Sequence, residues 1–132
     1  MNSILIDADG LVALAKTNDS NHEKALKISQ KIKDLNLYIT PFTIPEAATV
    51  ISYKVGQKEA KTFLESARTK KLIELPITKD LIDKADEIFL AQNKKGTSWI
   101  DCLNAAALKI HGLDAIFSFD SFYKQLKLSV IN

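Results

Sequence analysis

The chain has 132 residues, of which 46% are hydrophobic, and its formal net charge is +2. This length fits one domain over residues 1–132, with enough apolar side chains to bury a core. No apolar stretch approaches the roughly 18 residues of a membrane span, and the first residues lack the features of a signal peptide. Cys102 is the only cysteine, which excludes an intramolecular disulfide and agrees with a reducing compartment. We therefore expect a cytoplasmic protein without a membrane segment.

Apolar runs typical of strands alternate along the chain with segments of helical spacing. In chain order the predicted elements are a strand at 3–7, helices at 10–16 and 20–35, a strand at 36–40, helices at 43–56 and 57–70, a strand at 71–75, helices at 78–96 and 98–112, a strand at 114–120, a helical turn at 121–126 and a possible strand at 127–131. Strands joined through helices lie parallel. The order predicts an α/β fold, a three-layer α/β/α sandwich around a central, mainly parallel sheet of four to five strands.

Residues with known capping preferences mark several predicted helix ends. Asp9 stands where it would cap the helix at 10–16, because aspartate is a preferred N-cap residue. Gly96 and Gly112 are expected to end the two helices that precede them, because glycine readily adopts the left-handed conformation of a helix C-terminus. These residues set the helix boundaries that we expect.

Four carboxylates stand at similar places in the predicted elements. Asp7 and Asp120 follow apolar strands, whereas Glu46 and Asp101 lie in the first turns of helices. In a parallel sheet, the carboxyl ends of the strands and the N-termini of the following helices lie at one edge. The four acids are therefore expected to converge on one crevice.

Capping offers a purely structural explanation for the same acids. The stretches Thr43 to Glu46 (TIPE) and Ser98 to Asp101 (SWID) match the capping box, in which a hydroxyl residue is followed three positions later by a carboxylate. Asp120 also stands where it would cap the helical turn that follows it. Capping alone, however, does not require that the acids converge.

Converging carboxylates predict a metal site. Crowded carboxylates repel one another, and a divalent cation between them removes this penalty. Oxygen ligands without histidine or cysteine select hard ions such as Mg²⁺ or Mn²⁺, and Mg²⁺ favours phosphate as a further ligand. The residues thus indicate metal-assisted attack of water on a phosphodiester.

Charge supports a polyanionic substrate only if these four acids bind cations. The remaining chain then carries 18 basic against 12 acidic residues. Basic clusters stand at Lys27/Lys31/Lys33, Arg68/Lys70/Lys71 and Lys94/Lys95. The alternative is that each cluster is simply the solvated face of a helix.

Four stretches of the chain together resemble the acidic blocks of PIN-domain nucleases, especially the VapC-like toxins of toxin–antitoxin pairs. They are ILIDADGLVAL, TPFTIPEAATVI, GTSWIDCLNAAALKIHG and AIFSFDSFYKQL. The blocks occur in the family's order and spacing over essentially the whole chain. The resemblance implies a ribonuclease that depends on Mg²⁺ or Mn²⁺, forms a homodimer and is inhibited by a small antitoxin.

Matched position by position, the resemblance assigns the metal site to Asp7, Glu46, Asp101 and Asp120. We expect Asp7 and Asp101 to hold the principal ion, Glu46 to bind or orient the attacking water, and Asp120 to complete the site or to bind a second ion. Ser118 matches a hydroxyl residue that the family commonly has two positions before its last acid. All four acids are thus expected to be both metal ligands and catalytic residues.

The chain departs from the family directly after the first aspartate, where Ala8 and Asp9 replace the usual threonine and serine or asparagine. Asp9 is either an additional ligand or a helix cap. Asn104 follows Asp101 by one helical turn. It is either a hydrogen-bond partner of a metal-bound water or a phosphate, or a surface amide.

The other polar and aromatic residues have structural explanations. His22 and His111 lack metal-ligand spacing and are expected at the surface or at helix ends. Trp99 is expected to pack rather than to stack on a base. The remaining aromatic residues near the last acid are expected in the core and at its rim, and these are Phe117, Phe119, Phe122 and Tyr123.

Two alternative functions stay open. The stretch DADG also resembles the start of haloacid-dehalogenase-like phosphatases, in which Asp7 would be the nucleophile and Asp9 the general acid. This alternative leaves Glu46 and Asp101 without a role. The second alternative is a non-catalytic PIN-like module that binds RNA or docks a protein.

Overall fold

The computed structural model describes residues 1–132, and its five strands form one sheet. The sheet order is β3-β2-β1-β4-β5, and every neighbouring pair is parallel. The strands are β1 (Ser3–Ile6), β2 (Asn36–Ile39), β3 (Ile73–Glu74), β4 (Ala115–Phe117) and β5 (Val130–Ile131). The helices are α1 (Ala8–Ala15), α2 (His22–Ile32), α3 (Thr43–Lys54), α4 (Gln57–Ala67), α5 (Lys79–Leu90), α6 (Trp99–His111) and α7 (Phe122–Gln125). The predicted α/β fold is confirmed.

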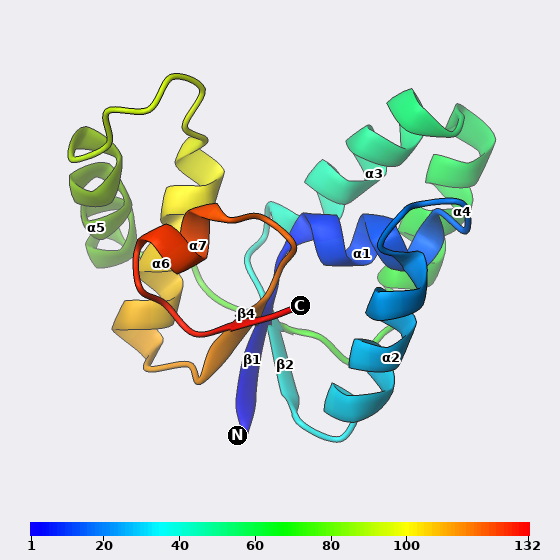
Figure 1. Ribbon diagram of the computed structural model, residues 1–132, viewed down its shortest axis with the longest axis horizontal. Helices are drawn as coiled ribbons and strands as arrows, with labels where there is room; N and C mark the ends of the chain where they lie inside the picture. The colour runs from blue at the N-terminus through cyan, green and yellow to red at the C-terminus, as the bar shows by residue number, and fades with distance from the viewer.

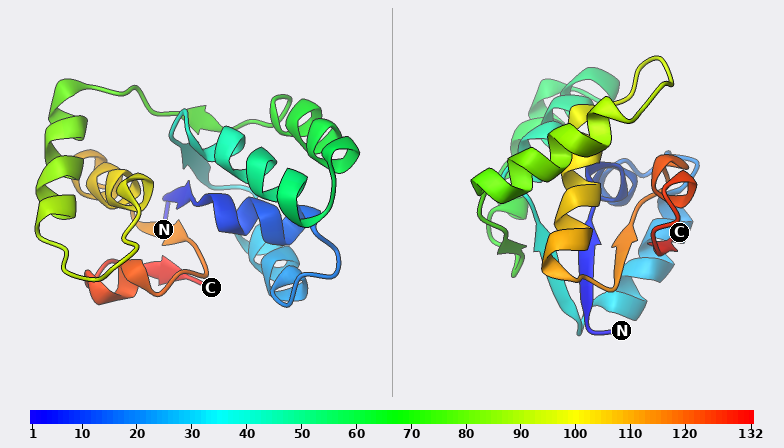
Figure 2. Two further views of the ribbon diagram at one scale, coloured as in Figure 1. Left: turned by 90° about the horizontal axis from the view of Figure 1, so that it is seen from above. Right: turned by 90° about the vertical axis from the view of Figure 1, so that its left-hand side faces the viewer.

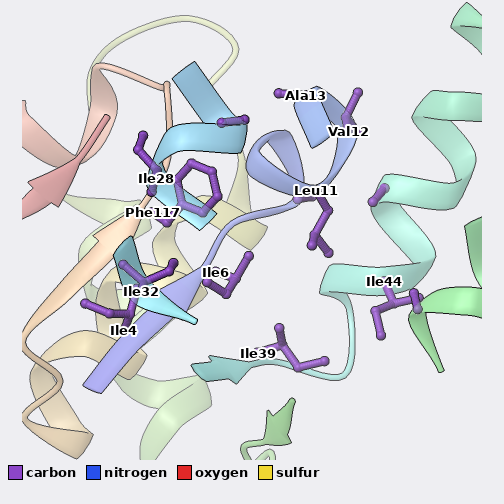
Figure 3. Packing of buried hydrophobic residues seen from close by; sticks show 14 of the residues in the cluster. Ile4, Ile6, Leu11, Val12, Ala13, Ile28, Ile32, Ile39, Ile44 and Phe117 are labelled. Carbon is purple, nitrogen blue, oxygen red and sulfur yellow. The ribbon is translucent and has the colours of Figure 1, made fainter. Parts of the chain in front are cut away.

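Helices cover both faces of the sheet and create the three expected layers (Figure 1). Seen from above, α1 to α4 lie on one side of the sheet, and α5 to α7 lie on the other (Figure 2). β1 supplies side chains to both halves of the core, because successive residues of a strand point to opposite faces. Ile4 and Ile6 join the first cluster, which also contains Phe117 of β4 (Figure 3), and Leu5 joins the second.

The central position of β1 places its carboxyl end in the middle of the sheet edge. Ile4 and Leu5 have no exposed surface, as expected for a strand that is covered on both faces. Ile6 lies opposite Phe117 of β4, so the residues that follow the two strands, Asp7 and Ser118, are neighbours. This edge is the upper one in Figure 1, where β1 leads into α1.

The predicted start of the first helix is wrong by two residues. α1 begins at Ala8, and its N-cap is Asp7 rather than Asp9. The side chain of Asp9 instead accepts hydrogen bonds from residues after β4. A partner that is distant in the sequence therefore overrides the local capping preference of this residue.

The helix predicted at 78–96 ends earlier, at Leu90. The side-chain amide of Gln92 donates a hydrogen bond of 3.0 Å to the carbonyl of Ile88, which also accepts one of 3.2 Å from the backbone N–H of Ala91 at the helix end. Gly96 lies beyond the helix with a φ of +84° and does not end it. Gly112, in contrast, ends α6 in the left-handed conformation as predicted.

The outer elements are also shorter than predicted. The strand predicted at 71–75 is reduced to Ile73–Glu74, and the possible strand at 127–131 to Val130–Ile131. These two strands form the edges of the sheet, and short edge strands offer little backbone for pairing with another chain. The longest helix has 13 residues, and none has the combined length and apolar character needed to cross a membrane.

Candidate active site

Asp7 lies directly after β1 and is fixed by both the strand and the helix that follows. Its backbone N–H donates a hydrogen bond of 3.0 Å to the carbonyl of Phe117. Its Oδ1 accepts a hydrogen bond of 2.8 Å from the backbone N–H of Ala8. Asp7 is only 4% exposed, so its carboxylate forms the buried base of the site.

Ser118 and Asp9 surround this base from the neighbouring segments. The Ser118 hydroxyl donates to Oδ2 of Asp7 at 2.8 Å and also lies 3.2 Å from Oδ2 of Asp9. The same oxygen of Asp9 accepts a hydrogen bond of 3.0 Å from the backbone N–H of Phe119. Asp9 is therefore not a helix cap; it ties α1 to the loop after β4.

Asp101 reaches the site from the start of α6. Ser98 is the N-cap residue, as predicted, and its hydroxyl accepts a hydrogen bond of 3.3 Å from the backbone N–H of Asp101. The Asp101 carboxylate does not complete a capping box, because its Oδ1 accepts a hydrogen bond of 3.1 Å from the hydroxyl of Tyr123. Its side chain is thus directed into the interior and not toward its own helix end.

Glu46 lies in the first turn of α3, but the predicted capping box is wrong there. The N-cap residue is Phe42, and Thr43 is a buried residue inside the helix. The Thr43 hydroxyl accepts a hydrogen bond of 3.1 Å from the backbone N–H of Thr40, which stabilises the turn before α3. The carboxylate of Glu46 is partly buried and has no hydrogen-bond partner within the chain.

All four predicted acids line one cavity of about 480 Å³. Its polar lining contains six carboxylates, which belong to Asp7, Asp9, Asp19, Glu46, Asp101 and Asp120. Asp19 was not identified from the sequence, where it stands in a polar loop without any distinguishing pattern. The lining holds a single basic side chain, Lys54. None of the six acids forms an ion pair, because both salt bridges of the chain lie within α5.

Burial and mutual repulsion raise the pKa of four of these carboxyl groups. Burial is the main cause at Asp101, followed by the charges of Asp7 and Asp120, and the pKa of Asp101 is about 7. Burial and then the charge of Asp7 likewise raise the pKa of Asp9 to about 7, and the same two causes raise that of Glu46. Burial also raises the pKa of Asp7, against the opposing effect of hydrogen bonds from Ser118 and Ala8. A cation would relieve this repulsion.

The donor set fits a hard divalent ion. Every ligating group available is an oxygen atom, the donor type that Mg²⁺ and Mn²⁺ prefer. Oδ1 of Asp9 is buried without a hydrogen-bond partner. No three of the acids have their oxygens around a common point as they stand. Binding therefore requires side-chain rotation, which the unrestrained Glu46 permits.

Asn104 and Tyr123 lie beneath the acids. Asn104 is 2% exposed and Tyr123 has no exposed surface, so the interpretation of Asn104 as a surface amide is wrong. The Asn104 amide donates to Oδ1 of Asp7 at 3.3 Å and to the Tyr123 hydroxyl at 3.1 Å. Tyr123 was expected in the core, where it lies, but its contact with Asp101 was missed. The signal in the sequence is a tyrosine close after Asp120, since a buried tyrosine hydroxyl usually requires a partner.

Trp99 and the two histidines, which were judged structural, lie outside the acidic cavity, whereas Phe119 is part of its lining. Trp99 packs against the second core cluster, and its indole N–H donates to Oδ1 of Asp86 at 2.8 Å. His22 lies at the start of α2, where Nδ1 is 2.7 Å from the carbonyl of Ala13. His111 is the exposed last residue of α6. Neither histidine lines the acidic cavity.

Two of the basic clusters contribute to a larger cavity of about 1010 Å³. This cavity involves α2, α4 and the segment before β3, and its basic lining residues are Lys33, Lys58, Lys70 and Lys71. Its lining is mainly apolar, and it shares no residue with the acidic cavity. The clusters are therefore not the rim of the acidic site.

The chain thus folds as an α/β/α sandwich around a parallel sheet, and its acidic residues gather at the edge where the strands end. The family model of the PIN domain matches residues 4–127, and the chain belongs to this family of nucleases. No curated protein matches the sequence.

Solved structures share the fold at low sequence identity. The toxin VapC20 of Mycobacterium tuberculosis is 18% identical with a TM-score of 0.82, and the match covers 95% of each chain. VapBC2 of Rickettsia felis is 13% identical with a TM-score of 0.71, covering 98% of each chain. FitAcB of Neisseria gonorrhoeae is 15% identical with a TM-score of 0.67, covering 98% of this chain and 96% of the other.

Proposed function

We propose that this protein is a metal-dependent ribonuclease that hydrolyses phosphodiester bonds of RNA in the cytoplasm, and that it is the toxin of a toxin–antitoxin pair. One observation carries the proposal: six carboxylates line one cavity, and none of them is neutralised by a basic side chain. Similarity to VapC20, whose structure is described as that of a toxin that cleaves the sarcin-ricin loop, supports the assignment to RNA. We propose RNA only as the class of substrate and do not assign the sarcin-ricin loop to this protein.

Asp7, Glu46, Asp101 and Asp120 would hold the ion, Mg²⁺ or Mn²⁺. When bound, the ion activates water as a nucleophile and neutralises charge that develops on the phosphate. Asp7 and Asp101 supply the fixed carboxylates, because each is anchored by hydrogen bonds. Glu46, which has no such anchor, is suited to orient the attacking water and to accept its proton. Asp120 completes the site from the loop after β4, where its Oδ1 accepts from the N–H of Phe122.

We further propose that the protein forms a homodimer and binds a small antitoxin protein. The similar structure VapBC2 is described as bound to a DNA fragment from its promoter. An arginine or an apolar segment of such a partner that entered the acidic cavity would displace the ion and block the site.

The geometry does not favour a phosphatase. A nucleophilic Asp7 must reach its substrate, but this residue is 4% exposed, and both of its carboxylate oxygens accept hydrogen bonds. Asp101 would also have no function in that reaction.

Incubation of RNA with the purified protein tests the proposal. The protein is freed of any bound inhibitor by unfolding and refolding, and single-stranded and structured RNAs are supplied with Mn²⁺, with Mg²⁺ or with EDTA. We expect cleavage only with metal, and a loss of at least about 100-fold in Asp101→Asn, because several kcal/mol of charge stabilisation disappear.

Asp80→Asn is the matched control, since Asp80 is also a first-turn acid but lies exposed on α5. It should cleave like the wild type. Metal-independent cleavage, or full activity of Asp101→Asn, would contradict the proposed mechanism. RNA binding without cleavage under all conditions would favour the non-catalytic module.

A further inference from the structure

A continuous chain of hydrogen bonds connects two acids of the site through the protein interior. The side-chain amide of Asn104 donates both of its hydrogens, one to Oδ1 of Asp7 (3.3 Å) and one to the hydroxyl of Tyr123 (3.1 Å). Tyr123 in turn donates its only hydroxyl hydrogen to Oδ1 of Asp101 (3.1 Å). The chain thus spans β1, α6 and α7 and ends at each side on a carboxylate.

The chemistry of the groups fixes the direction of these bonds. An ionised carboxylate only accepts, so both ends of the chain require donors. Rotating the Asn104 amide by half a turn would place its oxygen against Asp7 and leave a buried N–H without an acceptor. The arrangement with the amide nitrogen toward Asp7 is therefore favoured. It leaves Oδ1 of Asn104 buried without a partner.

This arrangement is not what stability alone would favour. Tyr123 belongs to the second core cluster, and the buried Asn104 lies on α6 between two residues of that cluster, Leu103 and Ala105. Burying a polar group without a partner costs free energy, and apolar residues of similar size would avoid the unpaired oxygen. A hydrogen-bonded pair at this place therefore indicates a role toward the carboxylates that it contacts.

We infer that Asn104 and Tyr123 are positioning residues that hold the Asp7 and Asp101 carboxylates in fixed orientations ready to bind the ion. This inference rests on the proposed metal site. The bonds occupy Oδ1 of Asp101 and leave its Oδ2 without a donor from the chain, so the free oxygen has one preferred direction. Groups that orient metal ligands typically change metal affinity 10- to 100-fold when they are removed.

Binding of Mn²⁺ to the full-length protein, measured by calorimetry in the absence of RNA, tests the inference. Tyr123→Phe removes one hydroxyl and keeps the ring, and we expect Mn²⁺ affinity to fall about 10-fold. Tyr38→Phe is the matched control, because Tyr38 is partly buried against the same core cluster and its hydroxyl makes no hydrogen bond. It should bind Mn²⁺ like the wild type.

The double variant Asn104→Leu with Tyr123→Phe separates positioning from packing. Because both polar groups are removed together, its thermal stability without metal should equal or exceed that of Tyr123→Phe. Its loss of Mn²⁺ affinity should exceed that of Tyr123→Phe alone, because it also removes the donor from Asn104 to Asp7. In RNA cleavage, kcat should fall while KM for RNA stays constant, and excess Mn²⁺ should restore kcat.

The outcomes distinguish this inference from the proposed function. If the wild type binds Mn²⁺ and cleaves RNA but Tyr123→Phe binds Mn²⁺ equally well, the pair only packs the core and the inference is wrong. If the wild type binds no Mn²⁺, the proposed metal site fails and the inference fails with it. A loss of stability in Tyr123→Phe without a loss of affinity also overturns it.

Discussion

Ser118 donates a hydrogen bond of 2.8 Å to Oδ2 of Asp7, and this bond joins the ends of the two central strands. It helps to keep the Asp7 carboxylate ionised, because a donor to a carboxylate stabilises the charged form. Asp101 receives its only donor from Tyr123 and faces the charges of Asp7 and Asp120. Burial, followed by the charges of these two acids, therefore raises the pKa of Asp101 to about 7.

This raised pKa predicts how stability depends on pH in the absence of metal. A carboxyl group whose pKa is higher in the folded chain stabilises the fold at low pH, and that contribution is lost as the pH rises from about 4 through about 7. Asp101→Asn cannot ionise. In EDTA we expect it to melt close to the wild type near pH 4 and several degrees higher near pH 8.

Thermal unfolding followed by circular dichroism between pH 4 and 8 measures this difference. Asp80→Asn removes an exposed acid of α5. The difference in melting temperature between this variant and the wild type should not increase from pH 4 to pH 8. Equal melting temperatures of wild type and Asp101→Asn at pH 8 would show that Asp101 does not experience the repulsion described.

The sequence pattern located the acids because their positions depend on local structure. Asp7 follows an apolar strand, Asp101 follows the N-cap Ser98, and these features place both at the carboxyl edge of any parallel sheet. The family resemblance added the order and spacing of the four acids. The fold class, the parallel sheet and the end of α6 at Gly112 were predictable for the same reason.

Contacts between distant segments could not be predicted in this way. Aspartate is a residue type that commonly caps helices. The Asp9 carboxylate nevertheless accepts a hydrogen bond from the backbone N–H of Phe119, which is 110 positions away. Thr43 matched a capping box but is buried within α3. Asn104 and Tyr123 meet only because α7 packs back onto α6. The pattern within a short stretch of sequence does not indicate such long-range contacts.

Lys54 is the only basic side chain that lines the acidic cavity, and it forms no ion pair. We predict that it contacts a phosphate of the bound RNA. Lys54→Gln should raise KM for RNA about 5-fold with little change in kcat. This factor corresponds to the loss of one ion pair that contributes about 1 kcal/mol to binding. The effect should shrink as salt is added, because exposed charges are screened.

Steady-state cleavage at two salt concentrations measures this effect. Lys109→Gln is the control, because Lys109 lies in the last turn of α6, away from the cavity. An equal rise of KM in both variants would attribute the effect to net charge rather than to Lys54.

Gly10 lies in α1 directly against the ring of Phe117. A Cβ atom at Gly10 would lie 3.0 to 3.2 Å from three ring atoms, and the ring is 1% exposed and packed edge-on against Phe119. Alanine favours a helix by about 1 kcal/mol over glycine, but overpacking costs about 1 to 3 kcal/mol. We predict that Gly10→Ala lowers the free energy of unfolding by about 1 kcal/mol.

Urea denaturation measures this change, and a smaller side chain at the contact provides the test of cause. In a Phe117→Leu background the same Gly10→Ala substitution should be neutral or stabilising. A loss of similar size in both backgrounds would place the strain elsewhere than at this contact.

The sheet order has a consequence for protein synthesis. The central strand β1 is made long before its neighbour β4, and Asp120 and α7 follow only after β4 has left the ribosome. Until then, the backbone N–H of Asp7 lacks its acceptor at Phe117, and α6 has no α7 to pack against. The nascent chain therefore holds an incomplete site until β4, Asp120 and α7 have all been made and have packed against the earlier elements.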